Sequence, residues 1–184
     1  DPVNTVIVPF KKKDEDVYFL VWTTTPWTLM ANVALCVNPD LTYLKVESQG
    51  YKFILCESLA DKVLGEDYKI LEKYKGSDLQ GIKYEQLLPF VKVEGKAFEV
   101  IADGYVTDSD GTGIVHIAPA YGVDDNRVCK EKGISFVGFS TLNLNIPFWN
   151  LSKNCAYPLA IANSFVMPFP FCPMFVPFTL ILNE

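Results

Sequence analysis

Short runs of β-branched and aromatic residues, each ended by a turn signal, constrain the fold of this 184-residue chain most. Runs of this length and composition favour strands over helices. We predict strands at residues 5–10, 17–21, 32–37, 42–47, 52–56, 68–75, 91–93, 98–102 and 114–117. The polar connectors 11–16 and 48–50 are of hairpin length, so the strands that flank each connector should pair antiparallel.

Two segments are predicted to form short helices. Residues 58–64 begin at Ser58, a good capping residue, and end before Gly65. Residues 123–132 place Asp124 and Asp125 in a first turn, where the helix dipole favours carboxylates. The fold class is therefore α+β: a mainly β, mostly antiparallel, barrel-like core with short peripheral helices. With 49% hydrophobic residues, the chain can form one domain with a proper core.

Three successive threonines close the second predicted strand, in the segment 22–28 (WTTTPWT). Alternation along a strand puts Thr23 and Thr25 on one face and Thr24 on the other. Thr25 has the chemistry of an N-cap and Pro26 suits a first helical position, so a short helix should follow. Such a junction offers hydroxyls and free backbone N–H groups to a carboxyl-derived oxygen or a water. A single run of this kind is nevertheless more often structural than functional.

A second polar stretch carries the only histidine of the chain, in residues 110–125 (DGTGIVHIAPAYGVDD). Its Gly- and Asp-rich beginning predicts a turn in which backbone can approach a ligand closely. The strand 114–117 then delivers His116. A lone histidine in an apolar strand is more often a buried structural residue, and the aspartates Asp103, Asp108 and Asp110 are expected in turns.

Together the two stretches resemble the editing domain, connective polypeptide 1, of isoleucyl-tRNA synthetase. The class I synthetases for Ile, Val and Leu share a threonine-rich strand end and a later segment of the type GTGxVHxAPxxGxxD. Trp27 stands where the valyl and leucyl versions usually carry an acidic residue, which favours the isoleucyl type. The flanking segments 31–39 and 125–129 look most like the eukaryotic or archaeal form. The resemblance covers roughly residues 1 to 133.

The resemblance implies an aminoacyl-tRNA ester hydrolase. Its substrate would be valine mistakenly esterified to tRNA(Ile), with valyl-adenylate as a further candidate. A pocket that fits isoleucine cannot strongly exclude a side chain one methylene smaller, and isoleucyl-tRNA synthetase is the standard example of that limit. The implied partners are the 3′ end of aminoacylated tRNA(Ile), valine as product, and the rest of the synthetase chain. No cofactor and no metal are implied.

The resemblance also assigns roles to residues of this sequence. Asp125, nine residues after the histidine, would supply the anion for the α-ammonium. The hydroxyls would hold the ester carbonyl oxygen, the terminal adenosine or the attacking water, and the candidates are Thr23, Thr24 and Thr25. The candidates for substrate binding and size selection are His116, Trp27, Thr28 and Gly122. Direct activation of a threonine by His116 is less favoured, because no pattern indicates a Thr-His-Asp triad.

Two alternatives remain open at this point. The first is a non-catalytic module that binds a nucleotide or a peptide through the same polar residues. The second is the editing domain of a valyl- or leucyl-tRNA synthetase, against which Trp27 argues. Only turnover separates a hydrolase from a binding module.

Composition gives weaker guidance about partners and location. The formal charge of −6 would repel a polyanion if it were evenly spread. The cysteines are odd in number and show no metal-ligand spacing, so they predict buried thiols in a cytoplasmic protein. They are Cys36, Cys56, Cys129, Cys155 and Cys172. The start at Asp1, without Met or a leader, suggests a single editing domain, 1–184, excised from a larger protein.

Residues 134–184 form an atypical apolar tail to that domain. They contain only two charged residues, Lys153 and Glu184, together with eight of the thirteen Phe and six of the twelve Pro. The spacing of the prolines forbids a continuous membrane-spanning helix, so no membrane association is expected. The family normally has polar, acidic sequence in this region.

Overall fold

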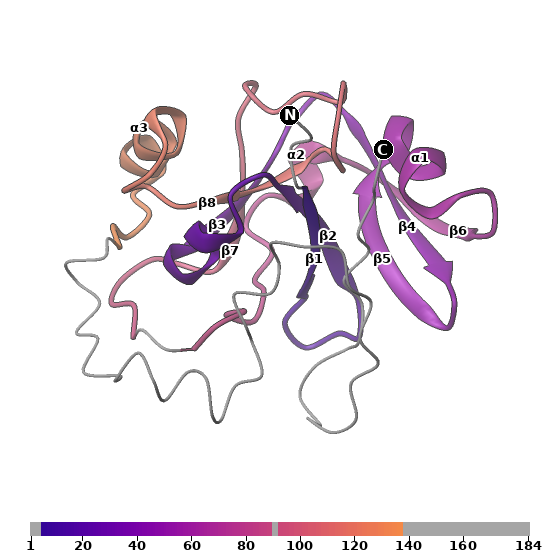
Figure 1. The fold of residues 1–184 in the computed structure, drawn as a ribbon, viewed down its shortest axis with the longest axis horizontal. Helices are drawn as coiled ribbons and strands as arrows, with labels where there is room; N and C mark the ends of the chain where they lie inside the picture. Colours follow the sequence, from indigo (N-terminus) through magenta and orange to yellow (C-terminus); the bar gives the residue numbers. More distant parts are fainter. Residues whose placement is uncertain (1–4, 90–91, 138–184) are drawn as a thin grey trace.

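The computed structural model describes residues 5–89 and 92–137, and one curled sheet of eight strands organises them (Figure 1). The strands are β1 (Val6–Lys11), β2 (Tyr18–Thr23), β3 (Ala34–Val37), β4 (Thr42–Ser48), β5 (Tyr51–Cys56), β6 (Lys69–Lys75), β7 (Glu99–Ala102) and β8 (Ile114–Ile117). Their order is β6-β4-β5-β2-β8-β3-β7, with β1 paired to β2. The predicted α+β, strand-rich class is confirmed.

The sheet curls, and the segment before β7 links that end strand to β1. Backbone bonds join Tyr84 to Phe98 beside β7 and Glu85 to Lys11 at the end of β1. Isolated bridges pair Lys12 with Tyr84 and Lys83 with Glu99. These links give the sheet its barrel-like shape.

Both predicted hairpins are present. β1 and β2 pair antiparallel, as do β4 and β5. The prediction of a mostly antiparallel sheet missed three parallel pairs, β2 with β5, β2 with β8, and β3 with β7. The β2–β8 pair aligns Trp22 with Val115. Because parallel neighbours end at the same edge of a sheet, the residues that follow β2 and β8 meet there.

Two predictions of local structure were wrong. No strand covers Lys92 and Val93, the described part of the predicted strand 91–93, where extended polar sequence with Gly95 at positive φ leaves the sheet. Ser58 does not cap a helix. It lies within the 3₁₀ turn η2 (Glu57–Leu59) and donates instead to Asp108 at 3.0 Å, and α1 (Ala60–Leu64) follows.

Helices cover the sheet at its edges. α1 contributes Ala60 and Val63 to the core cluster over β4 and β5. The helix α3 (Val123–Lys132) matches the predicted bounds, buries Val128 and Cys129, and ends at Gly133 in the left-handed conformation. The remaining elements are the 3₁₀ helix η1 (Pro26–Ala31) and the one-turn α2 (Gly76–Leu79).

The core lies inside the curl of the sheet. Phe10, Phe19, Leu35, Val100 and Ile114 are completely buried there. The described cysteines Cys36, Cys56 and Cys129 are buried and free, which confirms the prediction for these three thiols. The other two cysteines and most of the predicted apolar tail lie outside the described residues.

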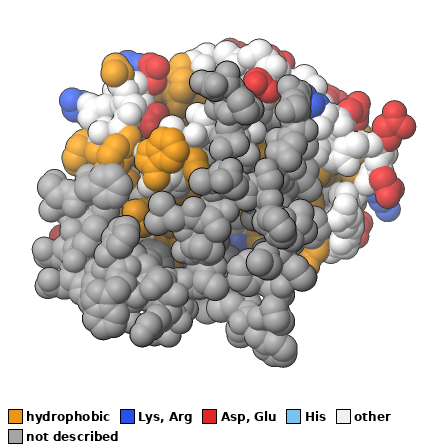
Figure 2. Space-filling model, viewed as in Figure 1, with side chains coloured by type: hydrophobic (Ala, Val, Ile, Leu, Met, Phe, Trp, Pro, Cys, Tyr) orange, Lys and Arg blue, Asp and Glu red, His pale blue; other side chains and the backbone are white. Residues whose placement is uncertain are grey.

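Charged side chains gather at the edge that carries β4, β6 and α1, on the face shown in Figure 2. Strand β6 is the edge strand there, and Lys and Glu residues line it. Charges on an edge strand oppose pairing with another chain. Within the described part of the chain, no helix is long and apolar enough to cross a membrane.

Candidate active site

A pocket of about 420 Å³ opens at the edge where β2 and β8 end. Its wall includes every residue that the sequence singled out: Thr23, Thr24, Thr25, Trp27, Thr28, His116, Gly122 and Asp125. The parallel pairing of β2 with β8 accounts for this convergence. It places the threonines after β2 beside His116 on β8 and beside the loop that leads into α3.

Thr23, Thr25 and Thr28 form a connected hydrogen-bond network, which does not include Thr24. The backbone N–H of Thr25 donates to Thr23 Oγ1 at 3.0 Å, and the Oγ1 atoms of these two residues are 3.4 Å apart. Thr28 Oγ1 donates to the carbonyl oxygen of Thr25 at 2.8 Å and lies 3.2 Å from Thr25 Oγ1. The prediction that Thr25 caps the helix with its side chain was wrong. Thr23 accepts the nearby N–H instead.

His116 joins this network through Nε2, which lies 3.1 Å from Thr28 Oγ1. Thr28 has a single hydroxyl proton, and the carbonyl of Thr25 receives it. With the Thr28 proton on that carbonyl, the imidazole donates from Nε2 and Nδ1 is unprotonated. Nδ1 is buried and has no hydrogen-bond partner among the described residues. Burial lowers the pKa of His116 to about 4, so the ring is neutral at physiological pH.

This protonation pattern bears on whether His116 could act as the general base that activates Thr28. A general base must receive the proton of its nucleophile. When the Thr28 hydroxyl donates to the Thr25 carbonyl, its proton is directed away from the ring and the imidazole supplies the proton of the His116–Thr28 bond. The geometry therefore suits a neutral wall of the pocket.

Asp125 lies in the first turn of α3 and faces the pocket. Its Oδ2 accepts the N–H of Ala118 at 2.9 Å, which ties the loop after β8 to the helix. Burial and the neighbouring Asp124 raise the pKa of Asp125, while the Ala118 hydrogen bond opposes the rise. A carboxylate has about four acceptor positions, so further lone pairs remain for a cation.

Gly122 gives Asp125 the room that it occupies. A Cβ at residue 122 would lie 2.8 Å from Asp125 Cγ and 3.0 Å from Oδ1. Its backbone angles, φ −130° and ψ 140°, are open to any residue, so space is what requires glycine. Gly122 thus affects the pocket through the carboxylate behind it.

The rim of the pocket is aromatic and exposed. Trp27 is 63% exposed, and Tyr121 also stands out from the surface. Thr24 is half-buried, and its hydroxyl makes no hydrogen bond to another described residue, so it can bind an oxygen or a water. Across the described ranges, no cluster of His, Cys, Asp and Glu could hold a metal ion.

The sequence did not identify four further residues of the wall: Trp22, Tyr105, Val115 and Tyr121. Trp22 and Val115 directly precede the predicted site residues Thr23 and His116 on the same strands, so these two wall residues could have been predicted from the sequence. Tyr105 follows β7 in a loop and reaches the pocket only through tertiary folding. Its hydroxyl oxygen is buried and has no hydrogen-bond partner within the described structure.

Comparisons with known proteins agree with this fold. No protein-family profile matches the chain. It is 51% identical over 134 residues to the isoleucine–tRNA ligase of Clostridium tetani and 46% identical over 134 residues to that of Picrophilus torridus. Each match covers 72% of this chain and 13% of the relative, so the chain spans about an eighth of the length of these curated relatives.

Solved structures show the same fold. The crystal structure of GlLeuRS-CP1 matches with a TM-score of 0.58 and 16% identity, over 70% of this chain and 64% of that one. The editing domain of the cytosolic leucyl-tRNA synthetase of P. knowlesi matches with a TM-score of 0.60 and 15% identity, over 72% and 64%.

The curled sheet with its pocket at the ends of β2 and β8 thus has the fold of the CP1 editing domains of aminoacyl-tRNA synthetases. Within that class, sequence identity decides the relationship. The chain is a relative of the isoleucine–tRNA ligases, at up to 51% identity, and it has the fold of the CP1 editing domains. The resemblance seen in the two motifs is confirmed.

Proposed function

We propose that this chain hydrolyses valine from mischarged Val-tRNA(Ile) and so maintains the fidelity of isoleucine attachment. The observation that carries the proposal is the convergence of Asp125, the threonine network and neutral His116 in one pocket of about 420 Å³. Similarity to the isoleucine–tRNA ligases supports this substrate. Valyl-adenylate carries the same valyl group and is a second candidate substrate.

Asp125 would hold the substrate by its α-ammonium group. The carboxylate is partly desolvated and already fixed by the Ala118 N–H. An incoming ammonium compensates the burial that raises the pKa of Asp125, so binding and ionisation favour each other. This anchor places the ester carbonyl towards the threonine side of the pocket.

The threonine side would position the water and the carbonyl oxygen. Water adds to the ester carbon, the bond to the ribose oxygen breaks, and that oxygen leaves with a proton, giving valine and tRNA. Hydroxyl and backbone N–H groups stabilise the negative charge that develops on the carbonyl oxygen. Among the described residues the Thr24 hydroxyl has no hydrogen-bond partner and suits this task, whereas the hydroxyls of Thr25 and Thr28 are bound within the network.

His116 and Thr28 would form the wall that limits the size of the amino-acid side chain. Both are buried, and their mutual hydrogen bond at 3.1 Å makes the wall rigid. A rigid wall excludes isoleucine by its extra methylene, which complements the weak discrimination of a synthetic site. Trp27 contributes an apolar surface at the rim.

The test is the release of amino acid from separately prepared Val-tRNA(Ile) and Ile-tRNA(Ile). The measurement uses the chain alone at high concentration and the full-length synthetase that carries it. We expect release of valine and not of isoleucine. Binding without release in both forms would contradict the proposal and indicate a non-catalytic module.

A further inference from the structure

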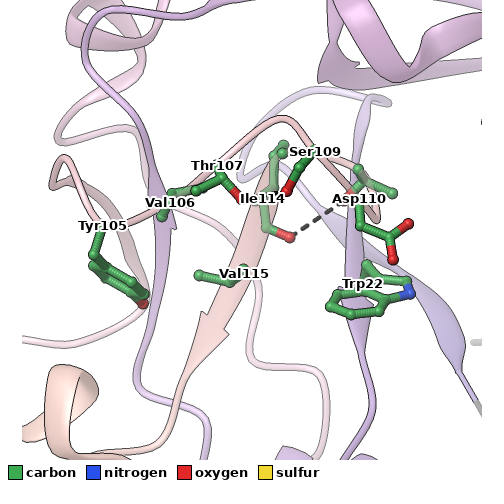
Figure 3. A pocket seen from close by; sticks show the side chains of 10 residues that line it. Trp22, Tyr105, Val106, Thr107, Ser109, Asp110, Ile114 and Val115 are labelled. Carbon is green, nitrogen blue, oxygen red and sulfur yellow. Dashed lines mark hydrogen bonds between the residues drawn. The ribbon is translucent and has the colours of Figure 1, made fainter. Parts of the chain in front are cut away.

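A second pocket, of about 290 Å³, adjoins the first, and the two share Trp22, Tyr105 and Val115 (Figure 3). Trp22 and Val115 are fixed as paired residues of β2 and β8. Gly111, at φ +75°, packs against the indole so closely that an added Cβ would lie 2.8 Å from the ring. Tyr105 is the member of this shared wall that no strand holds.

Tyr105 is held instead by Asp103, which precedes it in the loop after β7. The backbone N–H of Tyr105 donates to Asp103 Oδ1 at 3.1 Å. Tyr105 and Asp125 line the first pocket from two different elements, the loop after β7 and the helix α3. Burial raises the pKa of the Tyr105 hydroxyl, and the nearby Cys36 and Asp125 raise it further.

A bidentate ion pair joins those two elements. Arg127, the only arginine of the chain, lies on α3 two residues after Asp125. Its Nη1 donates to Asp103 Oδ2 at 3.0 Å and its Nη2 to Asp103 Oδ1 at 3.1 Å. This planar fork fixes direction as well as distance, which a lysine in the same place could not do.

Neither partner of the pair lines the first or the second pocket. The Arg127 side chain is 41% exposed and that of Asp103 is 16% exposed, so solvent screens the pair from the arginine side and its contribution to folding stability is small. The pair nevertheless connects the backbone that carries Tyr105 to the helix that carries Asp125. The ion pair therefore affects the distance between the two walls of the first pocket.

We propose that Asp103 and Arg127 are positioning residues that set the width of the pocket between Tyr105 and Asp125, and thereby its discrimination between valine and isoleucine. The inference rests on the proposed hydrolytic function. Loosening the pair lets the loop after β7 move away from α3, and the wider pocket then admits the larger side chain. Because a well-fitted pocket discriminates one methylene by roughly 10- to 200-fold, a looser pocket loses a substantial part of that factor.

The experiment compares kcat/KM for valine and isoleucine release in the full-length synthetase, for wild type, Arg127→Lys and Asp103→Asn. Arg127→Lys keeps the charge but removes the fork, and Asp103→Asn keeps an acceptor for the Tyr105 N–H. We expect the valine-to-isoleucine ratio to fall about ten-fold in both variants, with an unchanged Tm. The matched control is Glu131→Gln, which weakens another Arg127 contact, at 3.3 Å within α3, and should leave the ratio at the wild-type value.

The outcomes separate the inference from the function on which it rests. If the wild-type enzyme releases valine and both variants keep its ratio, the positioning role is wrong and the hydrolytic function stands. A ratio that changes only together with a lower Tm shows a merely structural pair and also overturns the inference. If the wild-type enzyme releases no valine, the proposed function fails and the inference fails with it.

Discussion

Asp125 shows, at the scale of single residues, that a binding group can reduce the stability of the fold. Its pKa is raised by burial, so the ionised form is less favourable in the folded chain than in the unfolded chain. Ionisation therefore destabilises the fold above the folded-state pKa, and this effect disappears as the pH falls through that value. Under the proposed function, the ammonium group of the substrate would offset this unfavourable ionisation.

We predict that Asp125→Asn abolishes hydrolysis without destabilising the protein. Loss of the ammonium partner should cost about 2–4 kcal/mol, which is roughly a 30- to 900-fold loss in kcat/KM. At pH 7 the free energy of unfolding should stay the same or rise, because the amide can still accept the Ala118 N–H. Deacylation kinetics and urea unfolding measure the two effects. The control is Asp124→Asn, an exposed neighbour, and hydrolysis that persists in folded Asp125→Asn would contradict the assigned role.

His116 gives the opposite sign of pH dependence. Its folded-state pKa of about 4 lies below the ordinary value of 6.5, so the unfolded chain binds the proton first as the pH falls. The neutral ring therefore stabilises the fold above pH 6.5, and this contribution is lost between about pH 6.5 and 4.

We predict that wild type loses about 2 kcal/mol of stability between pH 7 and pH 5 that His116→Gln does not lose. Urea unfolding of both proteins at the two pH values isolates the histidine from the carboxylates, which titrate in both. Equal losses would mean that the ring is protonated at its ordinary pH and that it is not the neutral wall described here. The rate of valine release should likewise show no inflection near pH 6.5.

At the scale of elements, the junction between the loop after β8 and helix α3 controls where Asp125 points. Gly122 is the last residue before the helix, and its missing side chain leaves room for the carboxylate. A methyl group there would displace the end of a flexible side chain and not the backbone. Stability and function should therefore respond differently.

We predict that Gly122→Ala lowers kcat/KM for valine release by at least about ten-fold, because small displacements of a binding group have large kinetic effects. The Tm should change little, since the backbone angles at residue 122 suit alanine. Gly104→Ala is the matched control, because an added Cβ there meets no atom within 4 Å. Equal kinetics for the two variants would show that the position of the Asp125 carboxylate is not critical.

Some elements of the fold could be predicted from the sequence and others could not. Hairpins, the bounds of β8 and the bounds of α3 follow from local patterns, so the sequence predicted them correctly. The parallel pair β2–β8 joins residues about ninety positions apart, and no local pattern encodes it. That pair brings the two polar motifs together, so the members of the site could be predicted only through a family resemblance. Tyr105 and the Asp103–Arg127 pair depend on tertiary contacts and were missed.

At the scale of the whole molecule, the charge of −6 bears on how a tRNA could reach the pocket. An acidic chain gains little from the release of counterions when it meets a polyanion. Under the proposed function, this chain receives only the aminoacylated 3′ end, and the rest of the synthetase holds the tRNA backbone. Recognition by the chain itself then depends on the aminoacyl group in the pocket.

We predict that valine release by the chain alone depends weakly on salt. Each phosphate contact contributes about −0.7 to −0.9 to the slope of log affinity against log salt, so a chain with one or two contacts should give a slope no steeper than about −2. The full-length synthetase should give a distinctly steeper slope under the same conditions. The measurement is kcat/KM for Val-tRNA(Ile) from 50 to 400 mM salt for both proteins. Equal, steep slopes would place the tRNA backbone on this chain, and a local basic surface would then have to overcome its net negative charge.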